Sequence, residues 1–200
     1  AEGYYSRALS LDPEFVDAYN ERGLSFVAQK AYEKAFADFD KAIRLKPDFA
    51  PAYYHRANEY DRIHQTEKAL EDYSISIAHD PNVLLPFFSR GKLLMELGRQ
   101  EEALSDFAKV IELDPNYAPA YSYTGEIYED RNQYEKAILN YSQAIEVSRK
   151  FALDYLHPQI SDRQEIKELM DYVNRTDVYP RLGRALSDRG RMYYNLKQFN

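Results

Sequence analysis

Four prolines stand 34 residues apart, at Pro13, Pro47, Pro81 and Pro115. A chain that repeats at a fixed interval of this length forms stacked copies of one structural unit rather than a single globular core. Each copy buries its apolar face against its neighbours. The period therefore predicts a repeat architecture before any single element is considered.

Positions counted backwards from each proline predict one helix in every unit. In the unit that ends at Pro47, Ala35 and Phe39 lie twelve and eight residues before the proline, and Ala42 and Ile43 lie five and four before it. Spacings of three and four residues trace one face of a helix. The proline ends that helix, because it has no N–H and disfavours the helical conformation of the preceding residue.

A second helix is expected ahead of this one in each unit. Its small residue, such as Gly23, lies between two bulky aromatic residues, here Tyr19 and Phe26. We interpret the aromatic residues as core, and the small residue as the point where the paired helix approaches closely. The fourth unit keeps this pattern but carries Arg149 in place of the proline, so its last helix is expected to continue to about His157.

These recurring positions resemble the motif of the tetratricopeptide repeat (TPR) family. The resemblance implies an all-α fold, a right-handed superhelical α-solenoid of antiparallel helix pairs in 34-residue repeats. It also implies a non-catalytic scaffold for protein–protein interaction. In the first full unit the motif consists of Tyr19, Gly23, Phe26, Ala35, Phe39, Ala42 and Pro47.

The phase of the motif predicts how the chain is divided. We expect four tandem repeats over residues 16–150, preceded at 1–15 by the second helix of a truncated repeat. Residues 183–200 are expected to form the first helix of a further truncated repeat. Between them, residues 151–182 interrupt the period, either as an insertion or as a decayed repeat, with a helix near 162–174.

A pair of opposite charges also recurs with the repeat. Three units carry an arginine just before the small residue of the first helix and an aspartate 16 residues later, and the fourth unit replaces both together. We hypothesise that each pair meets within its unit; the alternative is two independently solvated side chains. The pairs are Arg22 and Asp38, Arg56 and Asp72, and Arg90 and Asp106, with Thr124 and Asn140 in the fourth unit.

The resemblance also implies a binding groove lined by the first helix of each unit. Residues one turn apart on that helix would face a ligand. The candidate groove residues are Asn20, Leu24, Tyr54, Asn58, Arg62, Leu85, Phe88, Lys92, Met95, Glu126, Glu129, Asp130, Arg191 and Tyr194.

Two features of this set indicate what the partner would be. Tyr54, Leu85, Phe88 and Met95 are bulky or apolar at positions that the core does not require, and such a cluster is a candidate hot spot. Three carboxylates, at Glu126, Glu129 and Asp130, form an acidic patch. We expect a peptide or helical segment with an apolar anchor and a basic flank. The alternative is that these are ordinary solvated residues.

Composition excludes several other functions. The net charge of -7 opposes binding to nucleic acid or to an anionic membrane, and no apolar run approaches the roughly 20 residues that span a bilayer. The chain has no cysteine, and its histidines lack the spacing of metal ligands. We therefore expect no enzyme activity, no cofactor and no metal. The positions of the family's carboxylate clamp for a chaperone tail lack the required Lys and Arg, so no such clamp is expected.

Two alternative functions stay open at this point. Both ends of the sequence cut through a repeat, which would suit a regulatory or targeting segment of a larger enzyme. Unpaired half-repeats could equally dock onto another copy and form a homo-oligomer. The sequence leaves the compartment open, with a soluble cytoplasmic protein favoured over other locations.

Overall fold

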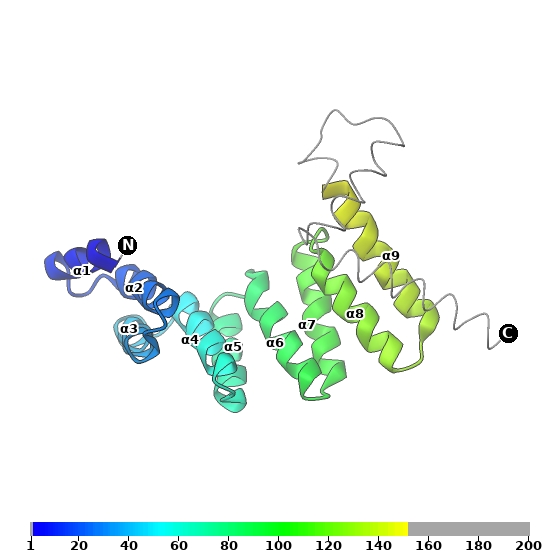
Figure 1. Cartoon of the computed structure of the whole chain (residues 1–200), viewed down its shortest axis with the longest axis horizontal. Helices are drawn as coiled ribbons and strands as arrows, with labels where there is room; N and C mark the ends of the chain where they lie inside the picture. The colour runs from blue at the N-terminus through cyan, green and yellow to red at the C-terminus, as the bar shows by residue number, and fades with distance from the viewer. Residues whose placement is uncertain (1, 152–200) are drawn as a thin grey trace. The chain divides into compact units, whose positions relative to one another are not determined.

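The computed structural model describes residues 2–151, and all regular elements in this range are helices (Figure 1). They are α1 (Glu2–Leu11), α2 (Val16–Ala28), α3 (Tyr32–Leu45), α4 (Ala50–Arg62), α5 (Thr66–His79), α6 (Leu84–Glu96), α7 (Gln100–Leu113), α8 (Ala118–Asp130) and α9 (Tyr134–Phe151). The residues near His157, the segment 151–182 beyond Phe151 and the helix expected at 183–200 lie outside the described residues.

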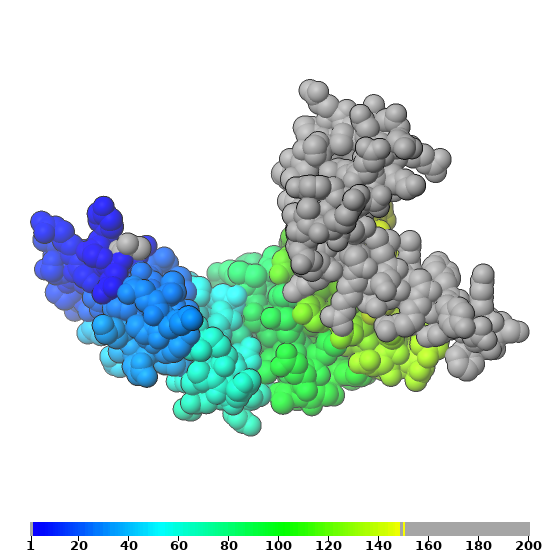
Figure 2. All heavy atoms as spheres, in the orientation of Figure 1, coloured from blue at the N-terminus to red at the C-terminus, as the bar shows by residue number. Residues whose placement is uncertain are grey.

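The helices form two compact units. The N-terminal unit contains α1 to α6 and ends at Leu97, whereas the C-terminal unit begins at Gly98 and contains α7 to α9. In the N-terminal unit, α2 pairs with α3 and α4 pairs with α5, and α4 also lies against α3 (Figure 1). In the space-filling view of Figure 2, the blue atoms of residues 16–45 adjoin the cyan atoms of residues 50–79. In the C-terminal unit α8 pairs with α9. The two-helix unit expected from the 34-residue period is therefore confirmed.

The aromatic residues of the motif form the core, as predicted. Phe26 of α2 packs with Ala35 and Phe39 of α3, and α4 and α5 build an equivalent cluster one repeat later. The small residue of the first helix has the predicted role. A methyl group on Gly23 would lie 2.5 Å from the ring of Phe39, so only glycine allows the two helices to approach this closely.

The turn within each repeat contains a left-handed residue at a 34-residue interval. Lys30, His64 and Asn132 have φ angles of 59°, 58° and 56°, and Gly98 has 72°. At the first turn the N–H of Lys30 donates to the carbonyl of Val27, and the next N–H donates to the carbonyl of Phe26, both at 2.9 Å. This is the Schellman arrangement that ends a helix. The sequence analysis missed it, because lysine and histidine are not typical residues for this conformation.

The turn between repeats is held by a tyrosine hydroxyl. The tyrosine six residues after the repeat proline donates to the carbonyl of that proline, which fixes the loop against the helix that follows. These bonds join Tyr19 to Pro13 (3.2 Å), Tyr53 to Pro47 (3.1 Å) and Tyr121 to Pro115 (3.2 Å). The position holds Phe87 in the third repeat, where no hydroxyl is available.

Candidate functional site

In the first two repeats the recurring arginine and aspartate meet, as hypothesised. In the first repeat, Nε and Nη2 of Arg22 donate to the two carboxylate oxygens of Asp38, both at 2.7 Å. In the second, Arg56 donates in the same way to Asp72, at 2.7 and 2.8 Å. This two-point geometry is the strong form of an ion pair. The members of the third pair belong to different units.

The second of these pairs is largely removed from water. Only 5% of the Asp72 side chain and 18% of the Arg56 side chain are exposed. Burial by itself lowers the pKa of Arg56, but hydrogen bonds to Asp72 and Asp40 outweigh burial and raise this pKa above its ordinary value. Arg56 therefore stays charged at any pH at which the protein folds, and it holds α4 against α5.

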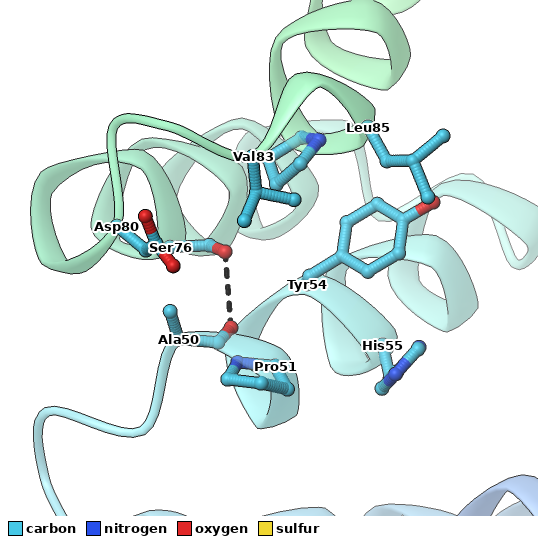
Figure 3. Close-up of a pocket in the computed structure, with 9 residues that line it drawn as sticks. Ala50, Pro51, Tyr54, His55, Ser76, Asp80, Val83 and Leu85 are labelled. Carbon is cyan, nitrogen blue, oxygen red and sulfur yellow. Dashed lines mark hydrogen bonds between the residues drawn. The ribbon is translucent and has the colours of Figure 1, made fainter.

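A cavity of about 220 Å³ opens between α4, α5 and α6 (Figure 3). Its apolar lining includes Pro51 and Tyr54 of α4, together with Val83 in the turn before α6 and Leu85 in the first turn of α6. Figure 3 shows the ring of Tyr54 next to Leu85, on one side of the hollow. The arrangement places apolar side chains from two successive repeats around one space.

Two polar contacts shape the opposite side of the cavity. The hydroxyl of Ser76 donates to the carbonyl of Ala50 at 3.0 Å, which ties α5 to the first turn of α4. Asp80 accepts a hydrogen bond from the N–H of Asn82 at 3.1 Å, and this bond orders the turn between α5 and α6. Asp80 also lines the cavity, where it is the acidic residue of a mainly apolar lining.

His55 extends the apolar character of the site. Its ring lies 5.1 Å from the ring of Tyr54 and 6.1 Å from that of Phe39, measured between centroids. Burial lowers the pKa of His55 to about 4, so the imidazole is neutral at neutral pH. The cavity therefore suits an uncharged side chain.

The structure brings two of the candidate groove residues together at this cavity. Leu85 is 42% exposed, and Tyr54, one repeat earlier, is partly buried beside it. Both therefore have surface that a ligand could cover.

Two other candidates occupy different surroundings. Phe88 was expected at a position that the core does not require, but it is only 6% exposed, because α6 buries residues on more than one face. The expectation of an exposed apolar Phe88 is therefore wrong. Asn20 is 4% exposed, and its side-chain amide donates to Glu21 at 3.2 Å. Neither side chain presents a free surface to a partner.

Several polar candidates are already engaged within their own unit. Asn58 accepts a hydrogen bond from the hydroxyl of Tyr73 at 2.8 Å, and Glu129 accepts one from Tyr141 at 2.9 Å. Arg62 donates to Glu59 at 2.7 Å, and its guanidinium lies 3.4 Å from the ring centroid of Tyr32. Of the others, Leu24, Lys92, Met95 and Glu126 are partly buried, Asp130 is exposed, and Arg191 and Tyr194 lie outside the described residues.

Several cavity residues were missed by the sequence analysis, which considered only the first helix of each repeat. A signal for one of them does exist in the sequence. Val83 occupies the position that holds Phe15, Phe49 and Tyr117 in the other repeats. The structure places Val83 in the cavity lining, where a valine fills less space than an aromatic ring.

Family models match three parts of the chain. Models described as "Tetratricopeptide repeat" match residues 16–49 and 120–151, and one described as "TPR repeat" matches residues 91–130. The chain contains tetratricopeptide repeats. The second repeat carries the same motif positions, including Tyr53, Ala57 and Tyr73.

Solved structures with this fold are numerous. MamA is 22% identical with a TM-score of 0.68, and the match covers 74% of this chain and 86% of MamA. YrrB is 28% identical with a TM-score of 0.61, over 80% of this chain and 82% of YrrB. PilF from Pseudomonas aeruginosa is 16% identical with a TM-score of 0.66, over 88% and 82%. No curated protein sequence matches the chain.

These findings establish the general character of the protein. The all-α solenoid class is confirmed, and the tetratricopeptide repeats support a scaffold for protein–protein interaction. Family and fold both point away from catalysis. Among residues 2–151 no helix could cross a bilayer, and no cluster of three or more metal-binding side chains is found in that same range.

Proposed function

We propose that the N-terminal unit binds a peptide or helical segment of a partner protein and anchors it by one apolar side chain in the cavity between α4, α5 and α6. The observation that carries the proposal is an apolar cavity whose wall includes the half-exposed Leu85. Covering this exposed side chain would remove apolar surface from water, which is favourable, and the cavity beside it offers further apolar surface to the same ligand.

The size of the cavity limits the anchor to one side chain. An apolar cavity of about 150 Å³ accommodates a benzene-sized molecule, so a cavity of about 220 Å³ has room for a single leucine, isoleucine or phenylalanine. Burial of such a side chain contributes about 1.5–3 kcal/mol. Anchors of this kind commonly supply a large share of the binding energy at protein interfaces.

Charge favours a basic residue beside the anchor. Asp80 is the acidic residue of the cavity lining, and the chain as a whole has a net charge of -7. In the C-terminal unit, Glu126, Glu129 and Asp130 follow one another along α8, with the same preference for a cationic segment. These charges would accelerate association with a basic partner more than they would raise its affinity.

A similar protein supports a peptide as the ligand. YrrB, 28% identical to this chain, is described as a TPR protein with an unusual peptide-binding site. We therefore propose a non-catalytic scaffold that recognises a short segment with an apolar anchor and a basic flank.

The test begins with peptides selected from a random display library on the wild-type chain. Affinities are then measured by fluorescence anisotropy for Leu85→Asp and for Val83→Phe, which introduces the phenylalanine found at this position in two other repeats. Leu97→Asp is the matched control, because Leu97 ends the same helix and is 46% exposed. We expect both cavity variants to weaken binding at least about tenfold, which corresponds to 1.4 kcal/mol, and the control to leave it unchanged. Equal affinity for all four proteins would place the peptide elsewhere.

A further inference from the structure

Arg56 does more than pair with the aspartate of its own repeat. Its Nη1 also donates to Oδ1 of Asp40 at 2.6 Å, and Asp40 lies on α3 in the preceding repeat. Arg56 therefore connects three helices, α3, α4 and α5, and the bond to Asp40 is an ion pair that joins one repeat to the next.

The position of Asp40 recurs with the period, but its residue type changes. It is Ser6 one repeat earlier and Ser74 one repeat later, and each serine is the neighbour of the corresponding arginine. Nη1 of Arg90 donates to the hydroxyl oxygen of Ser74 at 2.9 Å, and Nη1 of Arg22 donates to that of Ser6 at 3.4 Å.

The fourth repeat shows that the two positions change together. Thr124 replaces the arginine, and the residue 16 positions earlier is Ala108, which has no polar group to offer. A hydrogen-bond acceptor is therefore present at this position wherever an arginine faces it. In one repeat it is a carboxylate, and in two it is a hydroxyl.

We propose that Ser74 is a regulatory phosphorylation site, at which an added phosphate would pair with Arg90 as Asp40 pairs with Arg56. Ser74 is an exposed residue of α5 whose hydroxyl donates to the carbonyl of Leu70 at 2.7 Å, and the distance to its arginine is the shorter of the two serine contacts. Comparison of the repeats gives the acidic equivalent of a phosphoserine, because the preceding repeat carries the carboxylate of Asp40 at this position.

The reaction is an ordinary phosphoryl transfer. A protein kinase would transfer the γ-phosphoryl group of ATP to Oγ of Ser74. A new P–O bond forms as the bond to the bridging oxygen of the leaving ADP breaks, and the hydroxyl proton passes to the base of the kinase. The phosphate brings a charge of about −1.5 to −2. Guanidinium–phosphate pairs join opposite charges and are frequently bidentate, whereas the present contact joins the guanidinium of Arg90 to an uncharged hydroxyl.

The modification would act on the joint that forms the cavity. Ser74 is on α5 and Arg90 is on α6, and these two helices supply Ser76 and Leu85 to the cavity lining. A phosphate at Ser74 would hold the two walls together and pre-organise the site. The effect on peptide binding rests on the proposed function. The ion pair between a phosphate on Ser74 and Arg90 does not.

The pairing is tested by urea unfolding of the full chain carrying phosphoserine at position 74, and of Ser74→Asp. The matched control is Ala108→Asp, which adds the same charge at the same register position without a facing arginine. We expect Ser74→Asp to raise the folding equilibrium constant by a factor of up to about five, and phosphoserine to raise it further. Arg90→Gln in the same chain should abolish both gains. A gain for Ser74→Asp no larger than that for Ala108→Asp would overturn the proposal.

Two further readouts separate modification from binding. Phosphopeptide mapping of the protein purified from the cells that make it should find phosphate on Ser74, and its absence in growing and in starved cells would overturn the assignment. The affinity of a library-selected peptide should rise when position 74 carries phosphoserine. A stabilised chain with unchanged peptide affinity would retain the ion pair and refute its regulatory role, whereas a chain that selects no peptide would refute the proposed function alone.

Discussion

Arg56→Met is the substitution whose cost the structure predicts most clearly. Methionine keeps much of the aliphatic stem but removes all three charge-assisted bonds, two to Asp72 and one to Asp40. Loss of one partner from a buried ion pair costs about 3–5 kcal/mol, because the other charge stays buried without compensation. The bond to Asp40, whose side chain is 41% exposed, adds less than about 1 kcal/mol. We expect a total near 4 kcal/mol, a large fraction of the stability of an ordinary domain.

A double-mutant cycle isolates the contribution of the buried pair. Asp72→Asn keeps the shape of the side chain and removes its charge, so Arg56→Met should cost much less in that background. The free energies of unfolding, measured with urea and followed by circular dichroism, should give a coupling energy of about 2 kcal/mol, well inside the range for contacting residues. A coupling energy below about 0.5 kcal/mol would refute the argument that burial makes this pair important.

The chain contains a matched control for burial. Arg99 makes the same two-point contact with Glu102, at 2.7 Å for both bonds, but the side chains are 46% and 57% exposed. Arg99→Met should therefore change the urea midpoint very little, because water and salt screen an exposed pair. Equal losses from the two substitutions would show that geometry, rather than burial, determines the cost.

Three further predictions concern stability. Gly23→Ala should cost about 1–3 kcal/mol by thermal unfolding, because its methyl group would overlap the ring of Phe39. His64→Gly should raise the free energy of unfolding in urea by about 0.5–1 kcal/mol. Glycine removes the steric cost of the left-handed backbone at this position, and this gain exceeds the cost of its greater conformational freedom in the unfolded chain. Stability should fall as the pH drops from about 6.5 to 4, because the unfolded chain protonates His55 near its ordinary pKa while the folded chain, with a pKa of about 4, does not. The loss by pH 4 is about 3 kcal/mol, and His55→Gln should remove it from a pH series of urea midpoints.

The fold could be predicted from the sequence because the same residue types recur at the same positions of every repeat. Alanine and aromatic residues recur at fixed positions, as at Ala35 and Phe39, and prolines mark the ends of the second helices. A helix that is ambiguous in one repeat can therefore be assigned from the equivalent positions of the others. The pairing of Arg56 with Asp72 could be predicted for the same reason. Its extra bond to Asp40 could not, because that contact joins two repeats and is a carboxylate in only one of them.

The site was predicted only in part. Tyr54 and Leu85 were expected in the groove from their register, and the structure places both at the cavity. Phe88 was expected in the groove for the same reason but is buried, because its position along one helix does not reveal which residues cover the other faces of that helix. Asp80 and Val83 belong to the turn between repeats, so a prediction based on first-helix positions alone could not include them.

A partner segment that places an apolar side chain in the cavity between α4, α5 and α6 would change the surroundings of the methyl groups that line it. The most direct measurement is a methyl NMR titration of the leucine- and valine-labelled chain with a library-selected peptide. Binding in the cavity should shift the signals of Val83 and Leu85 with a common saturation curve, while those of the similarly exposed Leu97 and of Leu11 stay in place. Shifts confined to Leu97 or Leu11, with Val83 and Leu85 unchanged at saturation, would contradict it.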